Sequence, residues 1–425
     1  MPSRSVPERT TVASTLTIAA GQRGAHRDGN VLRWLAAYTS SMVGDSVYYL
    51  ALSWAAVQAG TPSQAGLVMT ASAVPRALLM LGGGVVADRL GPRRVVIGSD
   101  AVRCVAVLAV AALLFLTKPG LWPLALLALV FGTVDAVFVP AVGALPARVT
   151  SRDQLARVQG MRGLAIRFAS VVGAPLGGLG VALGGAAAAF GLAGLLIAVS
   201  VPLLVSVRIR ELPPDDTAGP RGGTAWADLV SGLGYVRRHR VLAPLMLAIA
   251  LGDLGFVGPL NVGLTLLSDE RGWGAAGMGW VLAGFGVGAG AASLLLTVRG
   301  RLPHAGRVAG WSILAGSVAV GGLAFAPTVA VAVGTALLIG LLTGLSGAMC
   351  GALLQTQADP AYLGRVTAVA SLVSLGLTPL SMPLSAAAIG AWGTGPVFVV
   401  SAVLCGLGGV VALCVRDLRR AELPR

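Results

Sequence analysis

The chain has 425 residues, of which 56% are apolar and 11% are charged. A mean hydropathy of +0.83 over this length excludes an ordinary soluble domain and indicates a protein that crosses a membrane many times. The formal net charge of +14 would favour nucleic-acid binding in a soluble domain. Here the basic residues stand in short loops between apolar segments, the usual charge bias of membrane proteins, so no nucleic-acid partner is expected.

Residues 1–30 contain scattered Arg and polar residues without a compact apolar core, so we expect a cytoplasmic tail and not a cleaved signal peptide. Twelve apolar segments follow, each long enough to cross a bilayer as a helix. They cover residues 31–57, 65–87, 95–117, 121–146, 158–182, 185–207, 241–268, 274–298, 305–327, 328–354, 365–390 and 394–415. The sequence therefore predicts an all-α membrane protein with twelve transmembrane helices.

One long polar stretch divides the twelve segments into two sets of six. Within it, Trp226 to Tyr235 predicts a short amphipathic helix on the membrane surface. The predicted organisation is a tail over 1–30, an N-terminal six-helix bundle over 31–209, a cytoplasmic linker over 210–240, a C-terminal six-helix bundle over 241–415 and a tail over 416–425. The even-numbered connections hold most of the Arg residues, whereas the other side holds Lys118 and Arg271, so both termini are expected in the cytoplasm of a cell-membrane protein.

The two sets of segments repeat each other, which predicts two bundles related by a pseudo-two-fold axis. Three pairs of short sequences stand at corresponding places: Leu155-Ala156-Arg157-Val158 and Leu363-Gly364-Arg365-Val366, Ala174-Pro175-Leu176 and Met382-Pro383-Leu384, and Gly44-Asp45 and Gly252-Asp253.

A charged turn separates the second and third segments. Its residues are Gly84, Asp88, Arg89, Gly91, Arg93 and Arg94. This order of glycines and charges resembles the motif that the major facilitator superfamily carries between its second and third transmembrane helices. The resemblance implies a gate, in which Gly84 lets span two approach span eleven and Asp88 lies near the start of span eleven when the carrier faces outward. Asp100 and Arg103, three residues apart just beyond the turn, are expected to pair locally.

Charged residues inside the predicted spans are the functional candidates, because a charge near the bilayer midplane is costly unless it faces a cavity or a partner. Helix rise places Asp45, Asp135, Asp253 and Arg76 in one layer, roughly 16–21 Å from the cytoplasmic boundary of a core about 30 Å thick. Arg76 could form a structural pair with Asp45 or Asp135. One base cannot neutralise three acids, so we expect at least two carboxylates to handle protons or cations.

Polar and aromatic side chains of the same spans are candidates for contact with a substrate. They are Arg76, Tyr38, Tyr48, Tyr49, Trp54, Asn261 and Gln355. Arg162 and Arg167 stand near the cytoplasmic end of span five. We expect them to have a structural role or to line the inner vestibule.

Span five carries a cluster of small residues around a proline. Gly173, Pro175, Gly177 and Gly178 allow close helix packing and a bend. The cluster resembles the antiporter motif of drug exporters in this superfamily, with the proline displaced by one position. Asp228 to His239, Gln357 to Val366 and Ala144 to Pro146 with Gln154-Leu155 resemble the enterobactin-exporter and macrolide-efflux branch. That resemblance implies proton-driven export of amphipathic drugs, antibiotics or siderophore-like metabolites.

Several chemistries are not indicated. The single Lys118 does not stand in a P-loop, and the three His and four Cys show no metal-ligand spacing, so we expect no enzyme activity, nucleotide, cofactor or metal. The expected partners are a small-molecule substrate, protons and the lipid bilayer, with the chain acting as a monomer. The alternatives are an importer of the same fold and a transport-inactive scaffold or sensor.

Overall fold

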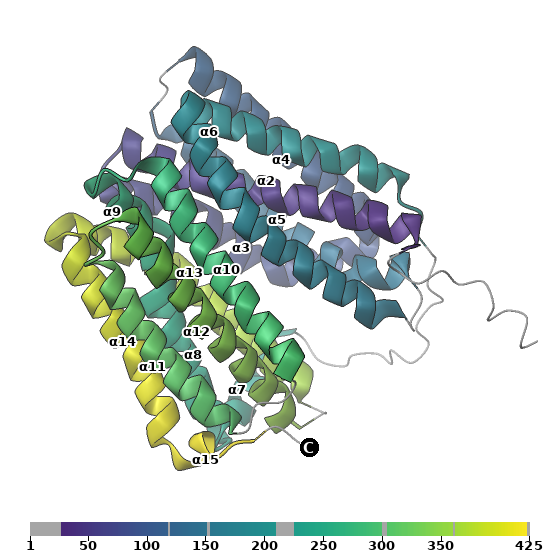
Figure 1. Cartoon of the computed structure of the whole chain (residues 1–425). Coiled ribbons are helices and arrows are strands. Elements are labelled where there is room, and N and C mark those ends of the chain that lie inside the picture. The colour runs from purple at the N-terminus through teal and green to yellow at the C-terminus, as the bar shows by residue number, and fades with distance from the viewer. Residues whose placement is uncertain are drawn as a thin grey trace, which may run out of the picture.

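A computed structural model describes residues 27–117, 120–150, 154–209, 225–299, 304–359 and 362–422. The predicted N-terminal tail up to residue 26, linker residues 210–224 and the last three residues lie outside this part. Over the described ranges the secondary structure is helical, with no strand (Figure 1). The prediction of an all-α protein is confirmed.

The described residues of the first half of the chain form five helices: α2 (Gly29–Ala59), α3 (Pro62–Leu90), α4 (Pro92–Leu116), α5 (Trp122–Val149) and α6 (Leu155–Ser206). The short helix α7 (Ala225–Arg238) lies where the amphipathic linker helix was predicted. The second half contains α8 (Leu242–Gly258), the π-helical segment η3 (Pro259–Gly263), α9 (Leu264–Glu270), α10 (Gly274–Arg299), α11 (Ala305–Leu323), α12 (Val329–Gln357), α13 (Leu363–Trp392), α14 (Thr394–Cys414) and α15 (Arg416–Arg419).

Helix α6 contains the fifth and sixth spans. Its backbone leaves the helical region at Gly184 and Gly185, and Gly185 has a φ of 69°, a left-handed conformation that favours glycine. The two arms lie side by side, because a Cβ at Gly180 would approach the Cα of Ala189 to 3.2 Å. The expected break between residues 182 and 185 is therefore a tight turn between two adjacent spans.

Eight helices in the described chain are long and apolar enough to cross a membrane, with α8, η3 and α9 taken as one. Counting both arms of α6, and adding α2, α3 and α11 in the same bundles, gives the twelve predicted crossings. Figure 1 shows the helices before and after the linker as two separate groups, here called the N-terminal bundle and the C-terminal bundle.

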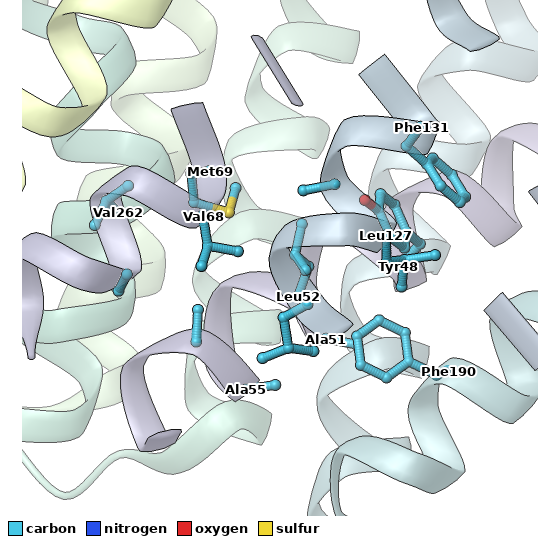
Figure 2. Close-up of a cluster of buried hydrophobic side chains, with 14 of the residues drawn as sticks. Tyr48, Ala51, Leu52, Ala55, Val68, Met69, Leu127, Phe131, Phe190 and Val262 are labelled. Atoms are coloured by element: carbon cyan, nitrogen blue, oxygen red, sulfur yellow. The ribbon is translucent and has the colours of Figure 1, made fainter. Parts of the chain in front are cut away.

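The N-terminal bundle is held by a core of aliphatic and aromatic side chains. The Tyr48 and Phe131 rings stack with centroids 3.6 Å apart, and Phe190 lies on the other side of Tyr48 (Figure 2). Val262 of η3 belongs to the same cluster as Val68 and Met69, so this core continues across to the C-terminal bundle.

The same glycine contact occurs in both bundles, between the second and fourth span of each. A Cβ at Gly83 or Gly132 would clash with the backbone of Ala136 or Ser72, between α3 and α5. A Cβ at Gly288 or Gly340 would clash with the backbone of Leu337 or Phe285, between α10 and α12. This repetition at the level of packing agrees with the repeat in the sequence.

Changing Gly132 to Ala is expected to destabilise the protein by about 1–3 kcal/mol, because the added methyl group overlaps the Ser72 backbone and α3 must move away. Gly143→Ala in the same helix is the matched control, since its Cβ meets nothing within 4 Å in the described chain. Thermal unfolding of the purified protein measures both variants. Equal shifts for the two would show that close packing at Gly132 contributes nothing.

Candidate functional site

Arg103 of α4 is fully buried and lies at the centre of three carboxylates. Its Nη1 donates to Asp45 Oδ2 of α2 at 2.8 Å and to Asp135 Oδ1 of α5 at 3.3 Å. Its Nη2 donates to Asp100 Oδ1, one turn earlier in α4, at 2.7 Å. One guanidinium thus ties three helices of the N-terminal bundle together. We call Arg103, Asp45, Asp100 and Asp135 the charge cluster.

Asp100 is the most fully bonded acid of the charge cluster. Besides Arg103, it accepts a hydrogen bond from Ser41 Oγ at 3.1 Å and another from the Ser200 hydroxyl. Donors on both carboxylate oxygens stabilise the ionised form. We therefore interpret Asp100 as the constant counterion of Arg103.

The surroundings of the Arg103 guanidinium are dry and aromatic. Its Cζ lies 3.8 Å from the centroid of the Phe138 ring and 5.8 Å from that of Phe131. In the described chain its Nε has no hydrogen-bond partner. A guanidinium stays charged even when it is buried, so it needs nearby anions to offset the cost of burial, and the three carboxylates supply them.

Asp135 connects the charge cluster to a cavity between the bundles. Its Oδ2 accepts from the Tyr49 hydroxyl at 3.0 Å and lies 3.9 Å from Arg76 Nη1 of α3. Tyr49 and Arg76 also line a cavity of about 320 Å³, together with Met69, Ser72 and Ala73 of the N-terminal bundle and Val257, Asn261, Leu375, Thr378 and Met382 of the C-terminal bundle. A change of charge at Asp135 would thus be felt at the cavity wall.

The charges of this region do not balance when every acid is ionised. Three carboxylates face the two guanidinium groups of Arg103 and Arg76. The region therefore carries one excess negative charge, which is costly away from water. One proton on Asp45 or Asp135 removes that excess.

The expectation that Arg76 is the one base in the midplane layer is wrong. The pair of Arg103 with Asp100 is confirmed, but the same Arg103 also reaches Asp45 and Asp135. Arg103 lies three residues, or about 4.5 Å, deeper than Asp100, and its long side chain covers the remaining distance. The signal in the sequence was an arginine one turn beyond an aspartate in an otherwise apolar helix.

The remaining candidates for substrate contact lie in different places. Tyr49, Arg76 and Asn261 line the inter-bundle cavity. Tyr38 is buried against Trp34, where its hydroxyl accepts from Arg162, and Tyr48 is in the bundle core. Trp54 packs on the core of the C-terminal bundle, and Gln355 is exposed near the end of α12.

Asp253 does not join the charge cluster. It lies on α8 in the C-terminal bundle and lines a second, larger cavity of about 480 Å³. Arg167 of α6 lines the same cavity from the other bundle.

The charged turn adopts the geometry that its glycine predicts. Gly91 has a φ of 84° between α3 and α4, Arg93 donates to the Val205 carbonyl at 2.5 Å, and Arg89 and Arg94 are exposed. A Cβ at Gly84 would meet no described atom within 4 Å, and the Asp88 side chain lies outside the described residues. The expected contact of this turn with span eleven, in the outward-facing state, stays a prediction.

The glycine cluster of α6 packs on both bundles. A Cβ at Gly173 would lie 2.5 Å from the Ser46 Cβ, and one at Gly177 would lie 3.2 Å from the Val47 Cα, both in α2. A Cβ at Gly178 would lie 2.5 Å from the Ala275 carbonyl oxygen of α10. Pro175 lies beside this contact, because a Cβ at Gly279 of α10 would come within 3.2 Å of its Cα.

The bundles also meet through polar contacts that the sequence did not indicate. Ser53 Oγ lies 2.6 Å from Thr265 Oγ1, and Gln58 donates to Asp269 Oδ1 at 2.6 Å. These residues and the Gly178 contact belong to the half of the protein away from the start of α2 and from α15, where Figure 1 shows the bundles close together near α9. Here that half is closed, and the bundles diverge toward α7 and α15.

Comparisons with known proteins agree with this architecture. The family model described as "Major Facilitator Superfamily" matches residues 34–375. Curated relatives include the enterobactin exporter EntS of Shigella boydii serotype 18 and that of Escherichia coli O139:H28, each 27% identical over 84% of this chain and 84% of the relative. Among solved structures, the POT family transporter PepTSo has a TM-score of 0.71 at 14% identity, covering 92% of this chain and 98% of that chain. The nucleoside transporter NupG has a TM-score of 0.67 at 14% identity, covering 93% and 100%.

Proposed function

Because the chain belongs to the major facilitator superfamily, we propose that it is a secondary active exporter that moves a hydrophobic or amphipathic small molecule outward in exchange for protons. The observation that carries the proposal is the one excess carboxylate that remains when the charge cluster and Arg76 are counted together, and Asp135 and Arg76 join this group to the inter-bundle cavity. A buried group that needs one proton beside a cavity between two moving bundles is what proton exchange requires.

In the proposed cycle, the proton and the substrate have opposite effects on the attraction between Asp135 and Arg76. With Asp135 ionised, Arg76 is held toward the charge cluster at 3.9 Å. Protonation of Asp135 weakens this attraction and leaves Arg76 free to interact with other groups at the cavity wall. The state of the proton therefore changes the cavity, and the contents of the cavity change the affinity for the proton, because such coupling is reciprocal.

We propose that the direction of transport is export, and two observations support this. Relatives over most of the chain carry the name of enterobactin exporters. The predicted cytoplasmic side, where the Arg residues of the loops gather, is the side toward which the bundles diverge. A carrier that binds its substrate from the cytoplasm would adopt this conformation before the substrate binds. In this proposal the charged turn around Asp88 closes that side in the next step, and Gly178 and Gly279 set the close contact on the other side.

The experiment is the accumulation of a panel of fluorescent lipophilic compounds in a drug-sensitive host from which the main efflux pumps are deleted. Expression of the protein is expected to lower the accumulation of at least one compound, and a protonophore is expected to restore it. Asp417→Asn, at an exposed site in α15, is the control variant and should export as the wild type does.

The two alternatives predict different results in the same assay. Accumulation that rises with expression would favour an importer of the same fold. A folded, membrane-located protein that changes the accumulation of no compound would favour the scaffold or sensor.

A further inference from the structure

A cavity of the C-terminal bundle is lined mainly by small and apolar side chains. Its volume of about 480 Å³ is within the usual range for small-molecule sites, about 300–1,000 Å³. It lies among α8, α10, α11, α12 and α14, and shares no lining residue with the cavity between the bundles. Its charged lining residues are Asp253, on α8, and Arg167, which reaches it from α6 of the other bundle.

The repeat of the chain relates this cavity to the charge cluster. Asp45 and Asp253 follow a glycine in the first span of each bundle, and Asp45 is paired with Arg103 of the third span. Arg103 lies eleven residues after Pro92, where α4 begins, and Gly316 lies eleven residues after Ala305, where α11 begins. The C-terminal bundle thus has glycine at the position from which the N-terminal bundle extends its guanidinium.

Small residues surround Gly316 along the cavity wall. Ser312 and Ser317 of α11 and Gly347 of α12 line the cavity with it. A Cβ at Gly316 would meet the Leu342 Cβ at 3.5 Å, an ordinary contact, so the site has room for a side chain. Arg103 packs against Phe131 and Phe138 in the N-terminal bundle, whereas Gly316 faces a cavity in the C-terminal bundle.

Asp253 has a carboxylate oxygen for which the described part of the chain offers no donor. Its Oδ2 is buried and has no hydrogen-bond partner in the described residues. The Ser374 hydroxyl interacts with the carboxyl group, but no described base lies within ion-pair distance of it. A buried acceptor without a donor is costly, and because Asp253 lines the cavity, an N–H group of a ligand there can pair with its carboxylate.

From these observations we propose that the cavity of the C-terminal bundle binds an amphipathic organic amine. The apolar body of the ligand fills the cavity, and its ammonium group donates to Asp253 as Arg103 donates to Asp45 in the other bundle. The proposal rests on the proposed export function, because it names the class of molecule exported as amphipathic amines. Arg167 lies on the opposing bundle, so a ligand held here would be in contact with both moving parts.

A metal ion is a poorer occupant than an amine. Asp253 is accompanied in the cavity by the thiols of Cys350 and Cys405, yet the described residues contain no group of three ligands that could hold a metal. An apolar wall with one acidic group suits a monovalent organic cation.

The test is the binding of dansylcadaverine, a fluorescent primary amine with an apolar ring system, to the purified protein in lipid nanodiscs, read by fluorescence polarisation against empty nanodiscs. N-acetyl-dansylcadaverine has the same body without the charge and is expected to bind about tenfold or more weakly. Asp253→Asn should produce a similar loss with dansylcadaverine, whereas Asp417→Asn, at an exposed site in α15, should leave binding within about twofold.

A second variant tests the position in the cavity without removing the acid. Gly316→Arg supplies the missing guanidinium from α11, so it should occupy the site, pair with Asp253 and abolish binding, while Gly316→Ala should retain it. Equal binding of the two probes, or unchanged binding in both Asp253→Asn and Gly316→Arg, would overturn the proposal. Binding needs no gradient, so a protein that binds the amine and exports nothing would contradict the proposed function alone. Export of neutral compounds without any Asp253-dependent binding would contradict this inference alone.

Discussion

Replacing Arg103 by Met should destabilise the N-terminal bundle by about 3–5 kcal/mol, the largest stability effect that we expect of any single substitution. The change leaves Asp45, Asp100 and Asp135 buried without their shared guanidinium. Arg76 cannot replace it, because in the described chain Asp135 is the one acid of the three within ion-pair distance of Arg76, at 3.9 Å. Thermal unfolding in detergent, followed by tryptophan fluorescence, measures the loss. Arg94→Met is the matched control, an exposed arginine of the same helix, and should change little.

A double substitution separates the loss of charge pairing from the loss of packing. Asp45→Asn in the Arg103→Met background removes one of the uncompensated charges, so the double variant should be more stable than Arg103→Met alone. If the two effects simply add, or if Arg103→Met is as stable as the wild type, Arg103 does not hold the three acids together.

Asp135→Asn should abolish the coupling of transport to protons, with at least about a tenfold loss of gradient-driven transport. The amide cannot take up the proton that balances the charge cluster together with Arg76, and it weakens the attraction between Asp135 and Arg76 at the cavity wall. Proteoliposomes with an imposed pH gradient provide the measurement, with exchange of substrate in the absence of a gradient as the internal comparison. Asp45→Asn is expected to give the same result, since Asp45 is the other acid that can carry the proton.

The exposed carboxylate of Asp417 provides the control, and Asp417→Asn should keep wild-type coupling. The assignment of the proton to a buried carboxylate is wrong if Asp45→Asn, Asp135→Asn and Asp253→Asn each retain full coupling.

The bounds of the spans were predictable because the bilayer itself sets them. A helix that crosses the hydrocarbon core needs about 20 apolar residues, and its backbone must be paired internally. The predicted segment 95–117 corresponds to Pro92–Leu116, and 365–390 to Leu363–Trp392. The largest difference is at the end of the ninth span, which reaches Leu323 and not residue 327.

The partners of the buried charges were less predictable, because depth along a helix does not give its rotation. Arg76 lies near Asp135, one of the two partners that the sequence left open for it, but the reach of Arg103 depends on how α4 turns toward α2 and α5. Tyr48 and Tyr49 are adjacent in sequence, yet one points into the bundle core and the other lines the cavity. A hydropathy pattern that is apolar all round the helix carries no signal for this choice.

The small residues in the sequence indicated that the helices pack closely, but not which helices are in contact. Small residues at the repeat positions predicted close approach, and Gly173, Gly177 and Gly178 indeed lie against backbone or Cβ atoms of α2 and α10. Which helix each glycine meets became clear only from the arrangement in space. Nothing in the sequence indicated the hydrogen bond between Gln58 and Asp269, because polar residues are ordinary at the ends of spans, next to the loops.

The central claim of proton exchange is tested most directly by proton movement in sealed proteoliposomes that hold the wild-type protein and a pH-sensitive dye. The compound is one whose accumulation falls in the cell assay, applied as a gradient without any imposed pH difference. We expect protons to move against the flow of the compound, with the signal absent in Asp135→Asn and present in Asp417→Asn. Protons that move in the same direction as the compound, or compound flux without proton movement, would contradict the account.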